Sequence, residues 1–227
     1  MAAQNAALVL TTGRGQDRSA LASVRALSAA GYEPIVGSSG PDSLAAASKH
    51  TTTTFLLPDS ESPQFADAVA QRVAGFGAVA VFASNDDALL ALDPTLDRLI
   101  DKSQLADHAV AAGLRVPTTL TFATAAELVA AGDEVSYPAV VKPALKQAGL
   151  PPYAASRADE VRADDHVGPV IVQPFLQEPG DAISGVMWSG NLVTSIRQDY
   201  IRTWPTSCGT AAAAVVAPPD PELSLIH

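Results

Sequence analysis

The sequence predicts an α/β protein in two domains. Residues 1–92 are expected to form a doubly wound parallel sheet, and residues 93–227 to form an α+β domain that is incomplete. Over the first domain, short apolar runs alternate with helical patterns, which is typical of parallel strands covered by helices. After Asp93-Pro94, which begins a helix, short helices are followed by strands joined by a tight turn. This change in element order places the domain boundary near residue 93.

The first domain is expected to alternate strands and helices along the chain. In the first helix, Leu21, Val24 and Leu27 recur at helical spacing, and Gly31 supplies the stop. The strands are expected at residues 6–11, 34–37, 52–57 and 79–83, and the helices at residues 18–30, 41–48 and 63–75. Strands and helices that alternate at this spacing predict a parallel sheet with helices on both faces.

Two loops of this domain follow strands, where open α/β sheets bind ligands. In the first, Gly13-Arg14-Gly15 begins a dinucleotide fingerprint, but Arg18 occupies the third glycine position and no acidic residue closes the second strand. A tight strand-to-helix turn is therefore the favoured interpretation. In the second loop, residues 84–87 either face a ligand or cap the next helix through Ser84 or Asn85.

The second domain is organised around residues 137–143, Tyr-Pro-Ala-Val-Val-Lys-Pro. An apolar run between two prolines predicts a strand buried on both faces. Because Pro143 has no N–H to donate, strand pairing is expected to stop there and Lys142 to project from the strand mouth. A lysine at this place suits a phosphate, and a surface lysine that merely ends a strand is the alternative.

The rest of this domain is read from caps and turns. A helix begins at Asp93, another opens at the capping box 124–127, and Ser189-Gly190-Asn191 is typical of a hairpin turn. Strands are expected at residues 119–122, 170–173, 181–188, 192–201 and 210–216. Asp220-Pro221 predicts one more helix, and because the chain ends soon after it, we expect the sequence to be cut short.

Composition excludes several classes of function. The 227 residues are 48% apolar with a net charge of −10, and no basic cluster offers a nucleic-acid footprint. No apolar stretch approaches the length needed to span a bilayer, so no membrane partner is expected. Cys208 is the only cysteine, which allows no internal disulfide and suits a cytoplasmic location. The histidines form no metal-ligand spacing.

Three features in a definite order resemble the ATP-grasp superfamily, in its carbamoyl-phosphate-synthase-like branch of carboxylate-amine ligases. They are Asp101-Lys102, residues 137–143, and residues 172–181. The resemblance implies an N-terminal pre-ATP-grasp domain and an ATP-binding domain. By the same resemblance, Lys102 and Lys142 contact the phosphates of ATP.

The resemblance also implies the rest of a nucleotide site. Gln173 would accept from the adenine amine, and the segment Phe175-Leu176 would pair with the ring edge, although both apolar residues also suit a core. Asp181 falls near the ribose-contacting acid of the family; a solvated strand-start carboxylate is its alternative. Arg197 and Arg202 are candidate contacts to an anionic substrate, since guanidinium pairs bidentately with carboxylate.

Two departures from the family limit what this chain can do. Residues 146–150 contain one glycine, where the family has a Gly- and Ser-rich loop over the phosphates. No acidic strand with Glu-x-Asn follows Val216, so the ligands for the Mg²⁺ expected of the parent protein are absent. Because Mg²⁺ stabilises the charge of the transferred phosphoryl group, the chain alone is expected to be inactive.

The function implied for the parent is activation of a carboxylate by ATP to an acyl phosphate, which an amine then attacks. Small-molecule carboxylate and amine substrates are the expected partners. The alternative is a nucleotide-binding regulatory module or pseudoenzyme without ligase activity. A sheet edge left bare would pair readily with another chain, which leaves a homodimer open.

Overall fold

The structure is a computed structural model that describes residues 5–12, 17–40, 42–145, 151–162, 168–177, 180–206 and 208–219, without the side chain of Asp133. The chain divides into two compact units, Met1–Ile100 and Asp101–His227. The sequence predicts the domain boundary near residue 93, and in the structure the chain divides after Ile100. The helix expected at Asp220 lies outside the described residues. No described helix combines the length and apolarity needed to cross a membrane.

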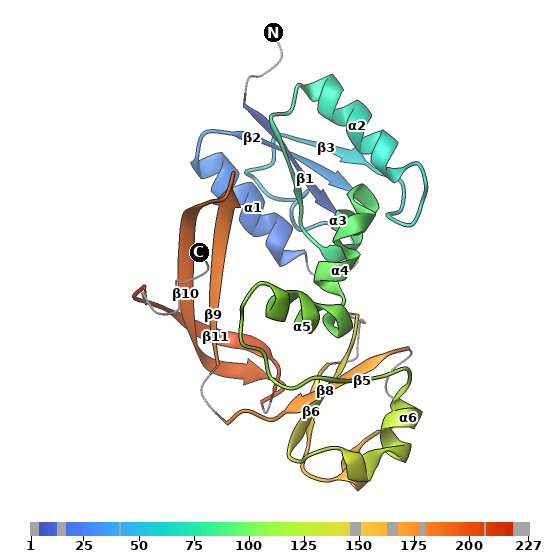
Figure 1. Cartoon of the computed structure of the whole chain (residues 1–227). Helices are drawn as coiled ribbons and strands as arrows, with labels where there is room; N and C mark the ends of the chain where they lie inside the picture. The colour runs from blue at the N-terminus through green and yellow to red at the C-terminus, as the bar shows by residue number, and fades with distance from the viewer. Residues whose placement is uncertain are drawn as a thin grey trace. The chain divides into compact units, whose positions relative to one another are not determined.

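The first unit contains a four-stranded parallel sheet in the order β3-β2-β1-β4 (Figure 1). Most of its helices and strands begin and end within one or two residues of the bounds that the sequence predicts. They are β1 (Ala6–Thr11), α1 (Arg18–Ala29), β2 (Glu33–Ser38), β3 (Thr53–Leu56), α2 (Phe65–Phe76), β4 (Ala80–Ala83) and α3 (Asp86–Leu92), followed by η1 (Pro94–Leu96) and α4 (Asp97–Ile100).

Alternate residues of β1 pack on opposite faces of the parallel sheet. Leu8 and Leu10 are fully buried in one cluster with Phe65 of α2, whereas Val9 is buried in another cluster with Val24 of α1. Each face is therefore covered by a helix, and β1 carries no exposed residue because it is central. This confirms the parallel sheet that the sequence predicts.

The helix predicted over residues 41–48 is wrong. Residues 42–48 contain turns only, with Ala47 N donating to the Ser43 carbonyl and Ser48 N to the Ala45 carbonyl. The Thr51 hydroxyl also donates to the Ala45 carbonyl, at 2.6 Å. Because side chains take up these backbone groups, one helical turn forms and does not propagate.

The second unit begins with α5 (Lys102–Ala111) and contains two antiparallel sheets. The first sheet has the order β5-β8-β6-β7, and Figure 1 shows α5 and α6 beside it. Its elements are β5 (Leu120–Phe122), α6 (Ala125–Ala130), η2 (Gly132–Glu134), β6 (Ala139–Pro143), β7 (Tyr153–Ala155), η3 (Ala158–Glu160) and β8 (Val170–Pro174).

The two faces of this sheet differ in composition. Val141, Val170 and Val172 pack against Leu128 of α6 in the buried core. Because side chains alternate along a strand, Lys142, Ile171 and Gln173 emerge on the opposite face. Within the predicted segment 137–143 the strand β6 forms over Ala139–Pro143, and each of its residues is buried except Lys142, which is half-buried.

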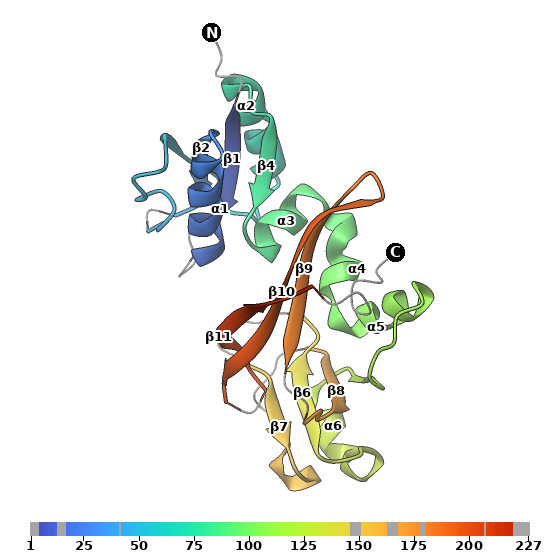
Figure 2. The same cartoon turned by 90° about the vertical axis from the view of Figure 1, so that its left-hand side faces the viewer.

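The last sheet has the order β11-β10-β9, and Figure 2 shows β9 and β10 as a long ribbon with β11 alongside. Its strands are β9 (Asp181–Trp188), β10 (Asn191–Trp204) and β11 (Thr210–Ala217). Ser189 and Gly190 both have positive φ, 49° and 78°, as a two-residue hairpin turn requires. The predicted hairpin is therefore confirmed at this turn.

Candidate nucleotide-binding site

The start of α5 is tied to the end of β6 through Lys102. Asp101 caps the helix by accepting from Ser103 N at 2.8 Å. The backbone N–H of Lys102 donates to the Ala144 carbonyl at 2.9 Å, and its Nζ donates to the same oxygen at 3.3 Å. A short polar cap thus brings one ammonium to the end of the strand that carries the other.

Burial acts to raise the pKa of Asp101, but hydrogen bonds from Ser103 and Gln104 outweigh it, with help from the Lys102 charge, and hold that pKa below its usual range. The carboxylate is therefore ionised at neutral pH and stays available to cap α5.

Lys142 lies within the strand ladder, near its end. Lys142 pairs with Ile171 and Pro143 with Val170, and Ala144 N still donates to the Pro169 carbonyl at 2.9 Å. The strand ladder between β6 and β8 ends at the pair of Pro143 with Val170, as the sequence predicts, and Lys142 lies one pair before that end. N–H groups alternate between the two neighbouring strands, so the missing N–H of Pro143 faces β7, whose pairing has already ended at Val141.

Both lysines line one pocket of about 390 Å³. The sequence places the two lysines on separate elements, and the family resemblance implies that both contact one ligand. The structure brings them together with Gln173. The walls between them are apolar side chains of α5 and of the segment before β5, namely Leu105, Ala106, Ala109, Leu114, Val116 and Pro117, with Ile171 from β8. An apolar cleft with a few convergent polar groups is the usual form of a small-molecule site.

The electrostatics of the pocket favour an anion. Burial lowers the pKa of Lys142, the neighbouring Lys102 charge lowers it further, and Cys208 acts in the opposite direction. No carboxylate of the described residues forms an ion pair with Lys142. Lys142 Nζ donates instead to a neutral acceptor, Gln173 Oε1, at 2.9 Å. An anion entering the pocket would therefore stabilise the charged form of Lys142.

Gln173 is held by a residue that the sequence did not single out. Its Nε2 donates to Thr119 Oγ1 at 2.9 Å, and the Thr119 hydroxyl donates to the Pro117 carbonyl at 3.0 Å. Thr119 lies just before β5 and directly precedes Leu120, which pairs with Val172. Only strand register could have identified it, because no local motif marks the position.

The remaining adenine candidates lie after β8. Phe175 is half-buried, and its N–H donates to the Pro138 carbonyl at 2.9 Å. Leu176 is 65% exposed, so it is not a core residue in this unit. Neither residue lines the pocket that contains Lys102 and Lys142.

Asp181 and Arg197 face each other across β9 and β10. The Arg197 Nε lies 3.6 Å from Asp181 Oδ2, and its Nη2 lies 3.3 Å from Asp199 Oδ1. The expected ribose contact and the expected substrate contact therefore meet in one ion-paired cluster. Arg202 is exposed beside a register shift in β10.

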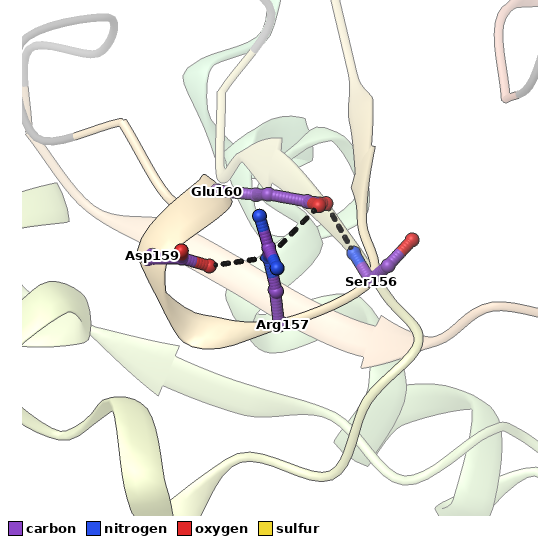
Figure 3. A network of polar contacts seen from close by, with 4 residues as sticks. All are labelled: Ser156, Arg157, Asp159 and Glu160. Atoms are coloured by element: carbon purple, nitrogen blue, oxygen red, sulfur yellow. Dashed lines mark hydrogen bonds and ion pairs between the residues drawn. The ribbon is translucent and has the colours of Figure 1, made fainter.

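A second hollow of the same unit is lined by an arginine of its own, Arg157. Figure 3 shows Arg157 with the polar side chains around it. Arg157 Nε lies 2.8 Å from Asp159 Oδ1 and 3.4 Å from Glu160 Oε1. Glu160 Oε2 also accepts from Ser156 N at 2.7 Å. Because two carboxylates of its own turn already neutralise Arg157, this hollow offers an anion less positive charge than the lysine pocket does.

Residues 84–87 of the first unit act as a helix cap. Asn85 Oδ1 accepts from Ala88 N at 2.9 Å, and Asn85 Nδ2 donates to Thr12 Oγ1 at 2.9 Å. Ser84 Oγ donates to the Leu10 carbonyl at 2.6 Å. The preceding glycine loop, residues 13–16, lies outside the described residues.

The donor set fits a nucleotide phosphate better than a metal. Among the described residues, no group of three or more His, Cys, Asp or Glu side chains is placed to hold a metal ion. Two ammonium groups in one apolar cleft, in contrast, match the charge of a phosphate chain. The two ammonium groups therefore fit the phosphates of ATP.

The sequence matches no protein-family model and no curated protein. Solved structures share the fold. An L-amino acid ligase from Bacillus licheniformis superposes with a TM-score of 0.66 and 18% identity, over 98% of this chain and 57% of that chain. N5-carboxyaminoimidazole synthase from Aspergillus clavatus, in complex with ADP and 5-aminoimidazole ribonucleotide, superposes with a TM-score of 0.61 and 16% identity, over 89% of this chain and 55% of that chain.

Phosphoribosylamine–glycine ligase from Thermotoga maritima gives a TM-score of 0.62 and 14% identity, over 92% of this chain and 54% of that chain. The chain therefore spans little more than half the length of the proteins it resembles. These likenesses show the fold, which this chain shares with the three enzymes.

Proposed function

We propose that this chain is the ATP-binding portion of an ATP-dependent ligase, which activates a carboxylate as an acyl phosphate for attack by an amine. The observation that carries the proposal is the convergence of Lys102 and Lys142 on one apolar pocket. The fold shared with ligases supports the reaction class. Residues 1–92 would be the pre-ATP-grasp domain and residues 93–227 the incomplete ATP-grasp domain.

In this proposal the two lysines hold the phosphates of ATP. Each ammonium is a charged donor, so among the parts of a nucleotide it is suited best to the anionic phosphate oxygens. Gln173 retains an acceptor position on Oε1 besides the one that Lys142 uses, because a carbonyl oxygen has two lone pairs. The adenine amine would occupy it, with Phe175 and Leu176 along the ring edge.

Asp181 would contact the ribose, and Arg197 and Arg202 the anionic substrate. For Asp181 and Arg197 this requires exchanging part of their present ion pair for ligand contacts. Asp181 is partly exposed, whereas the Arg197 Nε is buried, so a ligand oxygen would have to take the place of the carboxylate at that atom.

The chain by itself is proposed to bind nucleotide without completing ligation. When bound, Mg²⁺ would neutralise the charge on the transferred phosphoryl group, and no group of three or more His, Cys, Asp or Glu side chains among the described residues is placed to hold it. Small-molecule carboxylate and amine substrates, a cytoplasmic location and a homodimer remain part of the proposal.

Thermal unfolding tests the nucleotide site directly, because a ligand that binds only the folded state raises stability. ADP and ATP should raise the melting temperature, and NAD should not. Lys142→Ala should remove the increase, whereas Lys49→Ala, on the exposed surface of the other unit, should keep it. An equal shift in both variants would exclude the lysine pocket as the site.

A regulatory module would share this binding behaviour. Turnover distinguishes the two functions: a ligase, with its complete chain, releases ADP only when both a carboxylate and an amine are present. Binding without such release in the complete protein would favour the module.

A further inference from the structure

We propose that Thr119 is a positioning residue that locks Gln173 as a neutral acceptor for Lys142, through a hydrogen-bond chain that can run in one direction only. This proposal deepens the proposed function and rests on it for the identity of the ligand. Its consequence is that no carboxylate of the described residues pairs with Lys142, so that this charge is available to a phosphate and affinity rises with the number of phosphates.

Strand register brings the three side chains together. Leu120 pairs with Val172, so the residue before it, Thr119, lies opposite Gln173. Lys142 pairs with Ile171, so Gln173 is its diagonal neighbour on the same face. Diagonal neighbours in a sheet are about 7–8 Å apart at the backbone, which long side chains can bridge. The bridge is observed, with 2.9 Å between Lys142 Nζ and Gln173 Oε1.

The direction of the chain is fixed at the lysine end. An ammonium has three donors and no acceptor, so only the oxygen of the Gln173 amide can face Lys142. The amide nitrogen must then point away, toward Thr119 Oγ1, 2.9 Å from it. A flipped amide would set N–H donors against the ammonium.

The direction is also fixed at the other end. The Pro117 carbonyl can only accept, and the Thr119 hydroxyl lies 3.0 Å from it. The single hydroxyl hydrogen is therefore used on Pro117, which leaves Thr119 Oγ1 as an acceptor for Gln173. Both ends impose the same order, so Thr119 holds the amide in the orientation that Lys142 requires.

The neutrality of Gln173 matters because of its place in the pocket. Gln173 lines the pocket together with Lys102 and Lys142. A carboxylate at this position would pair with Lys142 and cancel one positive charge, and it would compete with Pro117 for the Thr119 hydrogen. An amide keeps the acceptor without the negative charge, so a phosphate chain meets both ammonium groups.

Lysine titration by NMR tests the positioning role without any ligand. Lys102 and Cys208 are the groups that act on Lys142 electrostatically, and they are unchanged in each variant. Thr119→Val removes the acceptor with little change of shape and should lower the pKa of Lys142 further. Thr119→Ser keeps the hydroxyl and should restore the wild-type titration.

Gln173→Glu should move the same pKa upward, because a carboxylate favours the ammonium form. Thr121→Val is the matched control, since Thr121 is exposed on β5 and its side chain has no hydrogen bond to another described residue. A Lys142 titration in Thr119→Val equal to that of wild type, with the fold intact by circular dichroism, would overturn the proposal. So would a failure of Thr119→Ser to restore it.

Nucleotide affinity then tests the charge selection. In the wild type, affinity should rise from adenosine through AMP and ADP to ATP. Gln173→Glu should flatten this rise and weaken ATP binding about 10-fold, the change expected for one charge-assisted contact. An undiminished rise in Gln173→Glu would refute charge selection. If the wild type binds none of these compounds, the proposed function fails, while the lysine titration still decides the role of Thr119.

Discussion

Replacement of Lys142 by methionine should separate binding from folding. Methionine has nearly the same length and no charge. In the free protein Lys142 is half-buried, and burial lowers the pKa of its ammonium. The charged form therefore costs folding free energy, and its removal should leave the melting temperature of the free protein unchanged or higher.

Nucleotide binding should respond in the opposite way. A hydrogen bond to a charged group contributes about 1.5–3 kcal/mol, which corresponds to a loss of roughly 10- to 100-fold in affinity. At an ADP concentration of about 100 times the wild-type Kd, stabilisation is about 2.7 kcal/mol. A 100-fold weaker variant retains about 0.4 kcal/mol under the same conditions.

Thermal unfolding with and without ADP measures both quantities in one experiment. The reasoning predicts an unimpaired free protein that ADP no longer stabilises. Two results would refute it: a loss of more than about 1 kcal/mol in the free variant, the size of an ordinary stabilising hydrogen bond, or a retained ADP shift.

Three further predictions follow from the site and the core. The pKa of Lys142 lies below the ordinary 10.5. ADP affinity should therefore be highest at pH values below that lowered pKa and fall as pH rises through it. Titration calorimetry should show no such fall in Lys142→Arg. The free protein should gain stability over the same pH range, as the buried ammonium deprotonates. Asp101→Ala should cost about 1 kcal/mol of stability through loss of the α5 cap and weaken ADP binding severalfold through Lys102. In the wild type, the stabilising effect of the Asp101 carboxylate is present at neutral pH and lost as pH falls through its lowered pKa, and urea unfolding at several pH values would show this loss. Leu128→Ala should destabilise the second unit by about 2–5 kcal/mol without changing the ADP affinity of the folded protein, and a changed affinity would mean that the core and the pocket are coupled.

The sequence predicted secondary structure best where the conformation of a segment depends on its own residues. The strand at residues 6–11 and the hairpin turn at Ser189-Gly190 were predictable, because an apolar run and a pair of positive-φ positions are local properties. The segment 41–48 was not, because Thr51 and Ser43 divert its backbone groups.

The candidate site shows the same division. Lys102 and Lys142 could be chosen from the order of the motifs. Their sharing of a pocket with Gln173 depends on the register of β6 against β8 and on the hydrogen bond between Lys102 and Ala144. Thr119 carries no local signal, since its role exists only through pairing with β8. Asp181 and Arg197 were assigned to different ligands, and their cross-strand pairing sets them 3.6 Å apart.

Apart from residues 41–48, the sequence by itself determined most of the segments that are strands and helices, and it determined which residues carry the charge for a phosphate site. Hydrophobic period, caps and turn residues act over a few positions, so they can be read without the fold. Only the tertiary structure decided which of those side chains meet. A shift of one residue between β6 and β8 would turn Gln173 away from Lys142, because neighbouring residues of a strand point to opposite faces.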